Sequence, residues 1–267
     1  MLSGIGAEST WRAVCIPETH PAEFGLAQME TLADELTGES VAPALLVWRS
    51  QRALLVTRTD THMPGFRESS DQIAAAGWPV VVRKSGGGAC PISPGTVQVA
   101  TIEPVVPGTT MNAKYDALTK LIQSTLQFFQ LVARSGPIAD AYCPGSYDLA
   151  IYGKKIAGIS QHWLRNHSGI RCVVTAASIN VEEAPDVLAD AVNRFYSNAE
   201  KPLRCQAASL TSVRLSGGDD VEAANLTPAV MNRLASFAGR TGGTIRQTFQ
   251  CVPAASSAHS SVIEQLI

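Results

Sequence analysis

The middle of the chain constrains the fold most, because it contains three strand patterns joined by tight turns. The first strand is expected at 147–152 and the second at 155–163, with Gly153 and Lys154 as a two-residue turn between them. The sequence RNHSG turns the chain again, and a third strand is expected at 170–179. Consecutive strands joined by such short turns predict an antiparallel meander.

Hydrophobic periodicity places further helices and strands around this meander. Helices are expected at 21–39, 112–132, 184–195 and 228–240, a short helix and a strand at 71–83, and further strands at 44–49, 53–58 and 97–102. The short separation of 44–49 from 53–58 predicts a hairpin. Strands and helices do not alternate regularly, so the predicted class is α+β. We expect a single domain over 1–255 and a mobile tail at 256–267.

Charge and hydropathy exclude several classes of protein. The net charge of −2 gives no basic footprint, so no nucleic-acid partner is expected. The longest apolar runs are much shorter than the roughly 18 residues of a membrane helix, and no signal-peptide pattern opens the sequence, so we expect a cytoplasmic protein without a membrane partner. The six cysteines contain no C-x-x-C pair, which predicts separate thiols and no metal site.

A glycine turn follows the strand that is expected before Arg83. It comprises Ser85, Gly86, Gly87 and Gly88. Glycines allow positive φ and a close approach of the backbone, so their amides could bind an anion or an acyl carbonyl. The alternative is a flexible connection between strands. The spacing fits neither a P-loop nor a dinucleotide-binding fingerprint.

A cysteine in a Cys-Pro-Gly turn, Cys143, precedes the meander, and Lys155 begins its second strand. A nearby cation makes a cysteine a better nucleophile, and a lysine can also donate to a carbonyl that gains negative charge. The first strand is roughly 20 Å long, so Cys143 meets Lys155 only if its loop folds back over the sheet. The alternatives are a buried core cysteine at this position and a nucleophile at Cys205, which is expected to begin a helix.

Two segments carry a resemblance to a known family. RKSGGGA, from Arg83, resembles the glycine loop of lipoate–protein ligase A and its relatives, and YDLAIYGKKIAGISQ resembles a second segment of theirs. The resemblance implies a biotin/lipoate ligase-type catalytic domain with a largely antiparallel mixed sheet flanked by helices. The whole stretch YCPGSYDLAIYGKKIAGISQ is similar to the cysteine-dependent octanoyl transferases, which move octanoyl or lipoyl groups between proteins.

This resemblance implies roles for individual residues. Cys143 would carry the acyl group as a thioester, and Lys155 would contact its carbonyl. Arg83 and the glycine turn at 85–88 would wall an apolar acyl channel. Gly158 would permit close approach, and Asp148 and Gln161 would orient the loop.

The implied donor is an acylated carrier, either the H protein of the glycine cleavage system or an acyl carrier protein. The implied acceptors are lipoyl domains of 2-oxoacid dehydrogenases, and no cofactor is expected. One alternative is a lipoate or biotin ligase that uses ATP and Mg²⁺ and forms an acyl-AMP. Ile92 and Ser93 stand where family ligases have His-Asp, which argues against ligation. A second alternative is a non-catalytic relative that binds an acylated carrier.

Overall fold

The structure is a computed structural model that describes residues 11–38, 42–198, 204–217 and 226–240. The single domain expected over 1–255 extends beyond these residues and stays a prediction. The tail expected at 256–267 lies wholly outside them. Among the helices that are described, none combines the length and apolar character needed to cross a bilayer.

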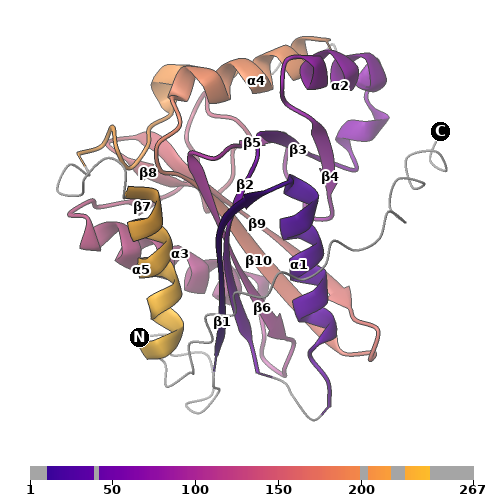
Figure 1. Cartoon of the computed structure of the whole chain (residues 1–267), viewed down its shortest axis with the longest axis vertical. Coiled ribbons are helices and arrows are strands. Elements are labelled where there is room, and N and C mark those ends of the chain that lie inside the picture. The colour runs from indigo at the N-terminus through magenta and orange to yellow at the C-terminus, as the bar shows by residue number, and fades with distance from the viewer. Residues whose placement is uncertain (1–10, 39–41, 199–203, 218–225, 241–267) are drawn as a thin grey trace.

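Two sheets form the centre of the described part of the chain (Figure 1). Seven strands make the larger sheet, in the order β1 (Arg12–His20), β2 (Ala44–Ser50), β6 (Thr96–Pro104), β10 (Arg171–Asn180), β9 (Lys154–Arg165), β8 (Leu149–Ile151) and β7 (Arg134–Ser135). Three strands make the smaller sheet, in the order β4 (Val80–Arg83), β3 (Ala53–Thr57) and β5 (Cys90–Ile92). Only β1 with β2 and β3 with β4 pair in parallel among these strands, so the predicted mixed, largely antiparallel sheet is confirmed.

Helices cover both faces of the larger sheet and one end of the molecule (Figure 1). They are α1 (Ala22–Asp34), α2 (Phe66–Ala75), α3 (Met111–Phe128), α4 (Pro185–Asn198) and α5 (Leu226–Arg240), with short 3-10 turns η1 (Asp60–His62) and η2 (Ala207–Ser209). Each parallel pair of strands is joined through a helix, α1 between β1 and β2 and α2 between β3 and β4. A crossover of this kind is what parallel neighbours require.

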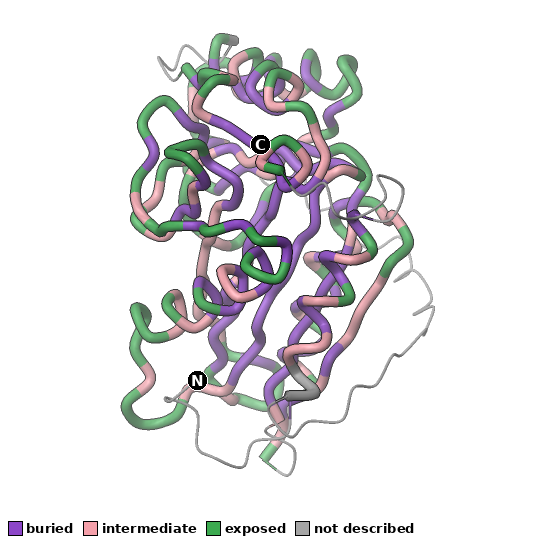
Figure 2. The backbone as a smooth tube through the Cα atoms, turned by 90° about the vertical axis from the view of Figure 1, so that its left-hand side faces the viewer, coloured by how far each residue is buried: buried purple, intermediate pink, exposed green. Residues whose placement is uncertain are grey.

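Alternate side chains of β2 belong to two different hydrophobic clusters, one on each face of the larger sheet. Leu45 and Val47 belong to a cluster shared with α3 and α5, whereas Ala44, Leu46 and Trp48 belong to a cluster shared with α1. Successive side chains of a strand point to opposite faces, so helices pack on both sides of the sheet. The central strands are accordingly buried along most of their length (Figure 2). A third cluster joins α2 and α4 to the smaller sheet.

One local prediction about the strands is wrong, and one strand was not predicted. The strands near 44–49 and 53–58 exist, but they do not form a hairpin, because β2 pairs with β1 and β6 whereas β3 pairs with β4 and β5. The strand β1 was not anticipated from the sequence; it supplies the partner that β2 uses instead of β3. The two residues Gln51 and Arg52 therefore connect two different sheets here.

The meander of β8, β9 and β10 is confirmed, but its first turn is displaced by one residue. Ile151 pairs with Lys154, so Tyr152 and Gly153 form the turn, with φ values of 51° and 75°. Positive φ at both central residues is the geometry of a type I′ hairpin turn. The register then shifts next to Lys155, where Ile156 is the extra residue of a β-bulge.

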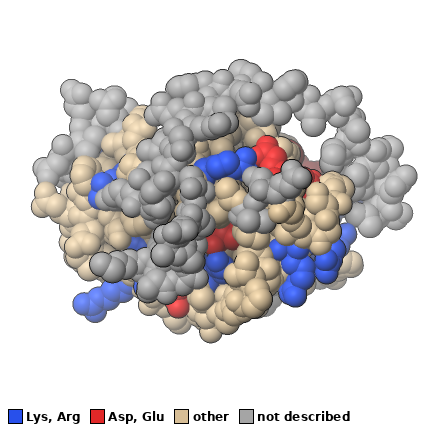
Figure 3. Space-filling model, turned by 90° about the horizontal axis from the view of Figure 1, so that it is seen from below, with Lys and Arg blue, Asp and Glu red and all other residues tan. Residues whose placement is uncertain are grey.

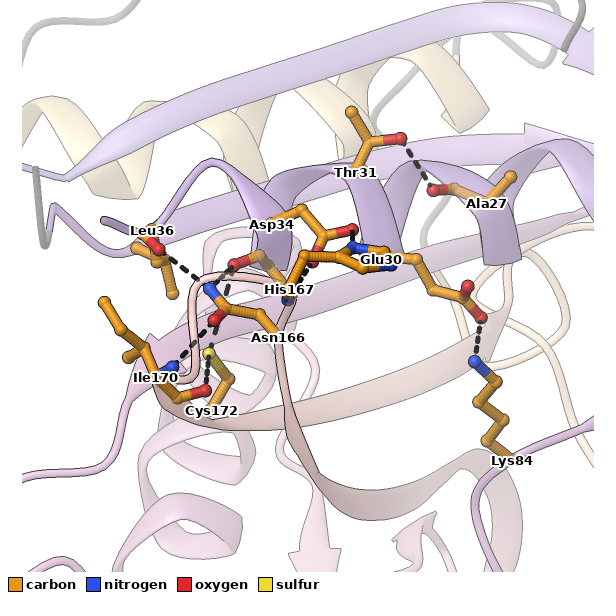
Figure 4. A network of polar contacts seen from close by, with 11 residues as sticks. Ala27, Glu30, Thr31, Asp34, Leu36, Lys84, Asn166, His167, Ile170 and Cys172 are labelled. Carbon is orange, nitrogen blue, oxygen red and sulfur yellow. Dashed lines mark hydrogen bonds and ion pairs between the residues drawn. The ribbon is translucent and has the colours of Figure 1, made fainter. Parts of the chain in front are cut away.

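The C-terminal end of α1 is fastened to the turn between β9 and β10 (Figure 4). Asn166 donates from Nδ2 to the carbonyl oxygens of Ala33 and Leu36, each over 2.7 Å. The backbone N–H of His167 donates to Asp34 Oδ1 over 3.0 Å. Side chains from a distant turn thus satisfy carbonyls that the end of a helix leaves without an intrahelical partner.

Charged side chains are dispersed on the face shown in Figure 3. Lys and Arg atoms appear there in several separate groups. This distribution agrees with the small net charge of −2.

Candidate active site

The thiol of Cys143 lies half-buried in the loop before β8, facing the glycine turn. The backbone N–H of Gly88 donates to Cys143 Sγ over 3.0 Å, and Arg83 Nη2 lies 3.7 Å from the same sulfur. Cys143 adopts φ = 42°, which is uncommon for a residue with a side chain. An amide donor and a guanidinium therefore both face this sulfur.

Lys155 explains why the loop of Cys143 folds back over the sheet. Its Nζ donates to the carbonyl oxygens of Tyr142 and Cys143 over 2.8 and 3.0 Å. It also pairs with Asp148 Oδ2 at 2.7 Å, and both side chains of this ion pair are almost fully buried. Asp148 in turn accepts from the backbone N–H of Gly145 over 3.0 Å. The geometric condition set by the sequence is met, since Cys143 returns to Lys155.

The contact made by Lys155 differs from the expected one. An ammonium group has three N–H donors, and all three are directed at acceptors of the protein, namely two backbone carbonyls and Asp148. A substrate carbonyl could bind Lys155 only by replacing one of them. The cation that the structure places beside the sulfur is Arg83.

Arg83 organises the glycine turn around the thiol. It donates to Ser85 Oγ and to the carbonyl oxygen of Gly88, each over 2.9 Å. Ser85 Oγ lies 3.0 Å from Ser160 Oγ, which joins the turn to β9. The Nε of Arg83 is buried and has no acceptor among the described residues. A buried donor without a partner is costly, and a substrate oxygen would satisfy it.

Two glycines of the turn are required by close approach to the thiol. Gly87 has φ = 112°, and a Cβ atom there would lie 2.7 Å from Cys143 Sγ and 2.9 Å from Arg83 Nη2. A Cβ atom on Gly88 would lie 2.9 Å from the hydroxyl of Tyr196. A Cβ atom on Gly86 would meet no atom within 4 Å, so close approach does not require glycine at this position. Lys84, next to Arg83, pairs with Glu30 of α1 at 2.7 Å (Figure 4).

The structure separates two other predicted site residues. Gly158 lies against the buried ion pair, because a Cβ atom there would be 3.3 Å from Lys155 Nζ and 3.5 Å from Asp148 Oδ1. Gln161 instead donates to Thr175 Oγ1 over 3.0 Å and accepts from Trp163 Nε1 over 2.8 Å. These hydrogen bonds reach neither the glycine turn nor the loop of Cys143, so the expected orienting role of Gln161 stays a prediction. The alternation of β9 directs its side chain away from the face that meets the glycine turn.

Cys205 does not have the surroundings expected of a second nucleophile. It is buried, and desolvation raises the pKa of its thiol. No α-helix begins there; only the 3-10 turn η2 follows, at Ala207–Ser209. Asn193 bonds both the N–H and the carbonyl of Cys205, over 2.7 and 2.8 Å. Burial without a helix N-terminus disfavours a thiolate.

Sequence reasoning missed residues that complete the site from distant elements. Tyr196 of α4 accepts from the N–H of Ala89 over 2.7 Å, and Asp60 of η1 accepts from Tyr196 over 3.1 Å. Ser160 of β9 bonds Ser85. Tyr196 follows Phe195 at an apolar position of a helix, and nothing in that local pattern distinguishes it from a core residue.

The sequence of residues 21–235 matches the lipoyl protein ligase A/B catalytic domain. An octanoyl-[GcvH]:protein N-octanoyltransferase of Kyrpidia tusciae is 30% identical over 86% of this chain and 82% of its own length. A protein of the same name from Bacillus velezensis is 31% identical over 73% of this chain and 67% of its own length. These relatives are named as acyltransferases, as the motifs predicted.

Solved structures share the fold. A lipoate-protein ligase A bound with ATP has a TM-score of 0.60 and 17% identity, covering 90% of this chain and 88% of that one. A bipartite lipoate protein ligase of Thermoplasma acidophilum, studied with its E2 lipoyl domain, has a TM-score of 0.58 and 18% identity over 90% and 87% of the two chains. The predicted α+β ligase-type fold is confirmed, and the chain belongs to the lipoyl protein ligase A/B catalytic domain family.

Proposed function

We propose that this protein transfers an octanoyl or lipoyl group from a carrier protein to a lysine of a lipoyl domain, through a thioester on Cys143. The observation that carries the proposal is the position of Cys143 Sγ. It is half-buried and accepts from the N–H of Gly88 at 3.0 Å, beside Arg83. A positioned thiol with donors around it is the arrangement that covalent acyl transfer needs.

In the first half-reaction with the H protein as donor, Cys143 Sγ attacks the carbonyl carbon of an acyl group held as an amide on a lysine of the carrier. The C–S bond forms and the C–N bond breaks. The proton of the thiol passes to the departing amine, and the carrier leaves with a free lysine. In the second half-reaction, the neutral amine of the acceptor lysine attacks the thioester. The new C–N bond forms, the C–S bond breaks, and the amine's proton returns to the sulfur.

Negative charge develops on the carbonyl oxygen in both halves of this reaction, and it requires donors close to the sulfur. The N–H of Gly88 already points at Cys143 Sγ, and the buried Nε of Arg83 lacks an acceptor among the described residues. We assign the contact with the carbonyl to these two groups. Lys155 holds the backbone of Cys143 in place and acts as a positioning residue.

The partners follow from the relatives and from the chemistry. Proteins 30–31% identical to this chain are named for octanoyl transfer from GcvH, which supports a glycine cleavage H protein as donor. An acyl carrier protein is the other carrier of the same acyl group. A solved structure of the same fold is described together with its E2 lipoyl domain, which supports a lipoyl domain as acceptor. The thioester route consumes no nucleotide and needs no bound cofactor.

The test is intact-mass analysis after the protein is mixed with octanoylated H protein in the absence of ATP. We expect one octanoyl mass on the unaltered protein and on Cys205→Ser, and none on Cys143→Ser. Octanoylation that is lost only in Cys205→Ser would reassign the nucleophile. If octanoyl transfer occurs only after ATP and free octanoate are added, and persists in Cys143→Ser, the result would support an acyl-AMP ligase. Binding of the carrier without any transfer would support a non-catalytic relative.

A further inference from the structure

Tyr196 is a fully buried residue of α4 whose hydroxyl reaches the glycine turn. It accepts from the N–H of Ala89 over 2.7 Å. Its ring packs edge-on against Phe195, with ring centroids 5.1 Å apart. Burial raises the pKa of Tyr196, so its phenol keeps its proton and can donate it while it accepts. The hydroxyl is therefore a fixed polar contact in an otherwise apolar cluster.

The peptide between Gly88 and Ala89 is held from both ends. Its carbonyl oxygen accepts from Arg83 Nη2 over 2.9 Å, and its N–H donates to Tyr196. The adjacent N–H of Gly88 is the one that donates to Cys143 Sγ. An added Cβ atom on Gly88 would lie 2.9 Å from the Tyr196 hydroxyl and 3.9 Å from the Cα and Cβ atoms of Cys143. Gly88 is thus enclosed between Tyr196 and the thiol loop.

Asp60 fixes the hydroxyl of Tyr196 from the opposite side. Its Oδ1 accepts from Tyr196 over 3.1 Å, and its Oδ2 accepts from the N–H and the hydroxyl of Thr57 over 2.9 and 2.8 Å. Asp60 is 1% exposed. A phenol that donates to a carboxylate becomes a stronger acceptor, because hydrogen bonds in a chain polarise one another. The carboxylate therefore strengthens the bond that Tyr196 accepts from Ala89.

We propose that Tyr196 and Asp60 are positioning residues that set the reactivity of Cys143 by holding the Gly88 amide toward its sulfur. This inference rests on the proposed function, because it concerns the same thiol. The hydrogen bonds described above join the two residues to each other, to Ala89 and to Thr57. Both act through the backbone of the glycine turn, which has little stiffness of its own because glycine lacks a side chain.

The experiment measures the rate at which iodoacetamide alkylates Cys143, as a function of pH, by mass analysis of the tryptic peptide 135–154. The variants are Tyr196→Phe, Asp60→Asn and the control Tyr152→Phe, which changes a tyrosine exposed in a turn. Removing the hydroxyl of Tyr196 should lower the rate near neutral pH about five- to tenfold, since one hydrogen bond to the turn is lost. The pH profile should also move to higher pH.

Asp60→Asn should change the rate in the same direction but less, because an amide oxygen can still accept from Tyr196. Tyr152→Phe should match the unaltered protein. A lower melting temperature in Tyr196→Phe with an unchanged pH profile would show a merely structural role and overturn the inference. If Cys143 of the unaltered protein reacts no faster than an ordinary exposed thiol, the proposed function fails as well. A reactive Cys143 that is indifferent to Tyr196→Phe contradicts the inference alone.

Discussion

Lys155 Nζ donates a hydrogen bond of 3.0 Å to the backbone carbonyl oxygen of Cys143. Cys143 precedes the strand β8, whereas Lys155 follows the turn after β8. The bond therefore forms only because the loop at 141–146 folds back over the sheet. The buried carboxylate of Asp148 fixes the same ammonium group at 2.7 Å. The position of the thiol therefore depends on an ion pair that does not touch it.

Lys155→Met should destabilise the protein and disorder the thiol loop. It leaves the carboxylate of Asp148 buried without its cation, which costs about 3–5 kcal/mol in the free energy of unfolding. Adding Asp148→Asn to this variant removes the unpaired charge and should restore much of the stability. Urea unfolding measures this recovery.

The double variant separates stability from function. Its thiol loop still lacks the two hydrogen bonds to the carbonyls of Tyr142 and Cys143, so octanoyl loading of Cys143 should stay low. Full loading in a stable double variant would contradict the positioning role given to Lys155.

Gly87→Ala should abolish the reactivity of Cys143 at a modest cost in stability. The new Cβ atom would lie 2.7 Å from Cys143 Sγ and 2.9 Å from Arg83 Nη2. Gly108→Ala is the matched control, because Gly108 also has a positive φ, of 85°, but has open space around it. Both variants incur left-handed strain of roughly 1 kcal/mol. Only Gly87→Ala should lose alkylation of Cys143, and equal losses in both variants would show that strain alone is responsible.

The partly exposed cysteines should respond differently to pH. Burial raises the pKa of Cys90 to about 11 and the pKa of Cys15 to about 11. A raised pKa keeps a thiol protonated and unreactive at neutral pH. Iodoacetamide near neutral pH should therefore label Cys143 before Cys90 and Cys15. Labelling of Cys90 and Cys15 should grow only as the pH approaches their pKa values. Peptide mapping checks this order, and early labelling of Cys90 would contradict it.

The contacts of Asp34 in α1 with His167, in the turn between β9 and β10, should weaken in acid (Figure 4). The backbone N–H and the ring of His167 hold the pKa of Asp34 below its ordinary value of 3.8. The folded protein then binds this proton less readily than the unfolded chain. The stabilisation is fully present above the ordinary value and is lost as the pH falls through the folded one. Because the partner His167 is almost fully exposed and Asp34 is partly exposed, the effect should be small.

Asp34→Asn tests this dependence. The difference in melting temperature between the unaltered protein and Asp34→Asn should narrow as the pH falls from about 5 towards 2. A difference that stays constant with pH would show that the carboxylate contributes no charge-dependent stability.

Local patterns predicted the helices and the meander, because periodicity and turns are encoded by neighbouring residues. They did not predict strand partners. The segments at 44–49 and 53–58 have hairpin spacing, but β2 pairs with β1 and not with β3. The parallel pairing of β1 with β2 requires the crossover helix α1, which the local spacing of the two segments does not show. The turn after β8 was misplaced by one residue because Tyr152 occupies a left-handed position that glycine usually fills.

The same limit applies to the site. Arg83, Cys143 and Lys155 stand in recognisable segments, so the sequence could nominate them. Their contacts could not be predicted, because the ammonium group bonds the backbone of Cys143 and the guanidinium lies beside the sulfur only after the loop folds back. Tyr196 comes from a helix 107 residues beyond Ala89, and no nearby residue marks it.

The central claim is that a thioester on Cys143 lies on the route of the acyl group, and a single-turnover chase tests it most directly. Protein loaded with radiolabelled octanoyl on Cys143 is freed of donor and ATP and mixed with an unmodified lipoyl domain. We predict that label leaves Cys143 at the rate at which it appears on the domain's lysine. In a parallel sample, unlabelled octanoylated donor is added back; label that remains on Cys143 while unlabelled octanoyl reaches the domain there would contradict the account.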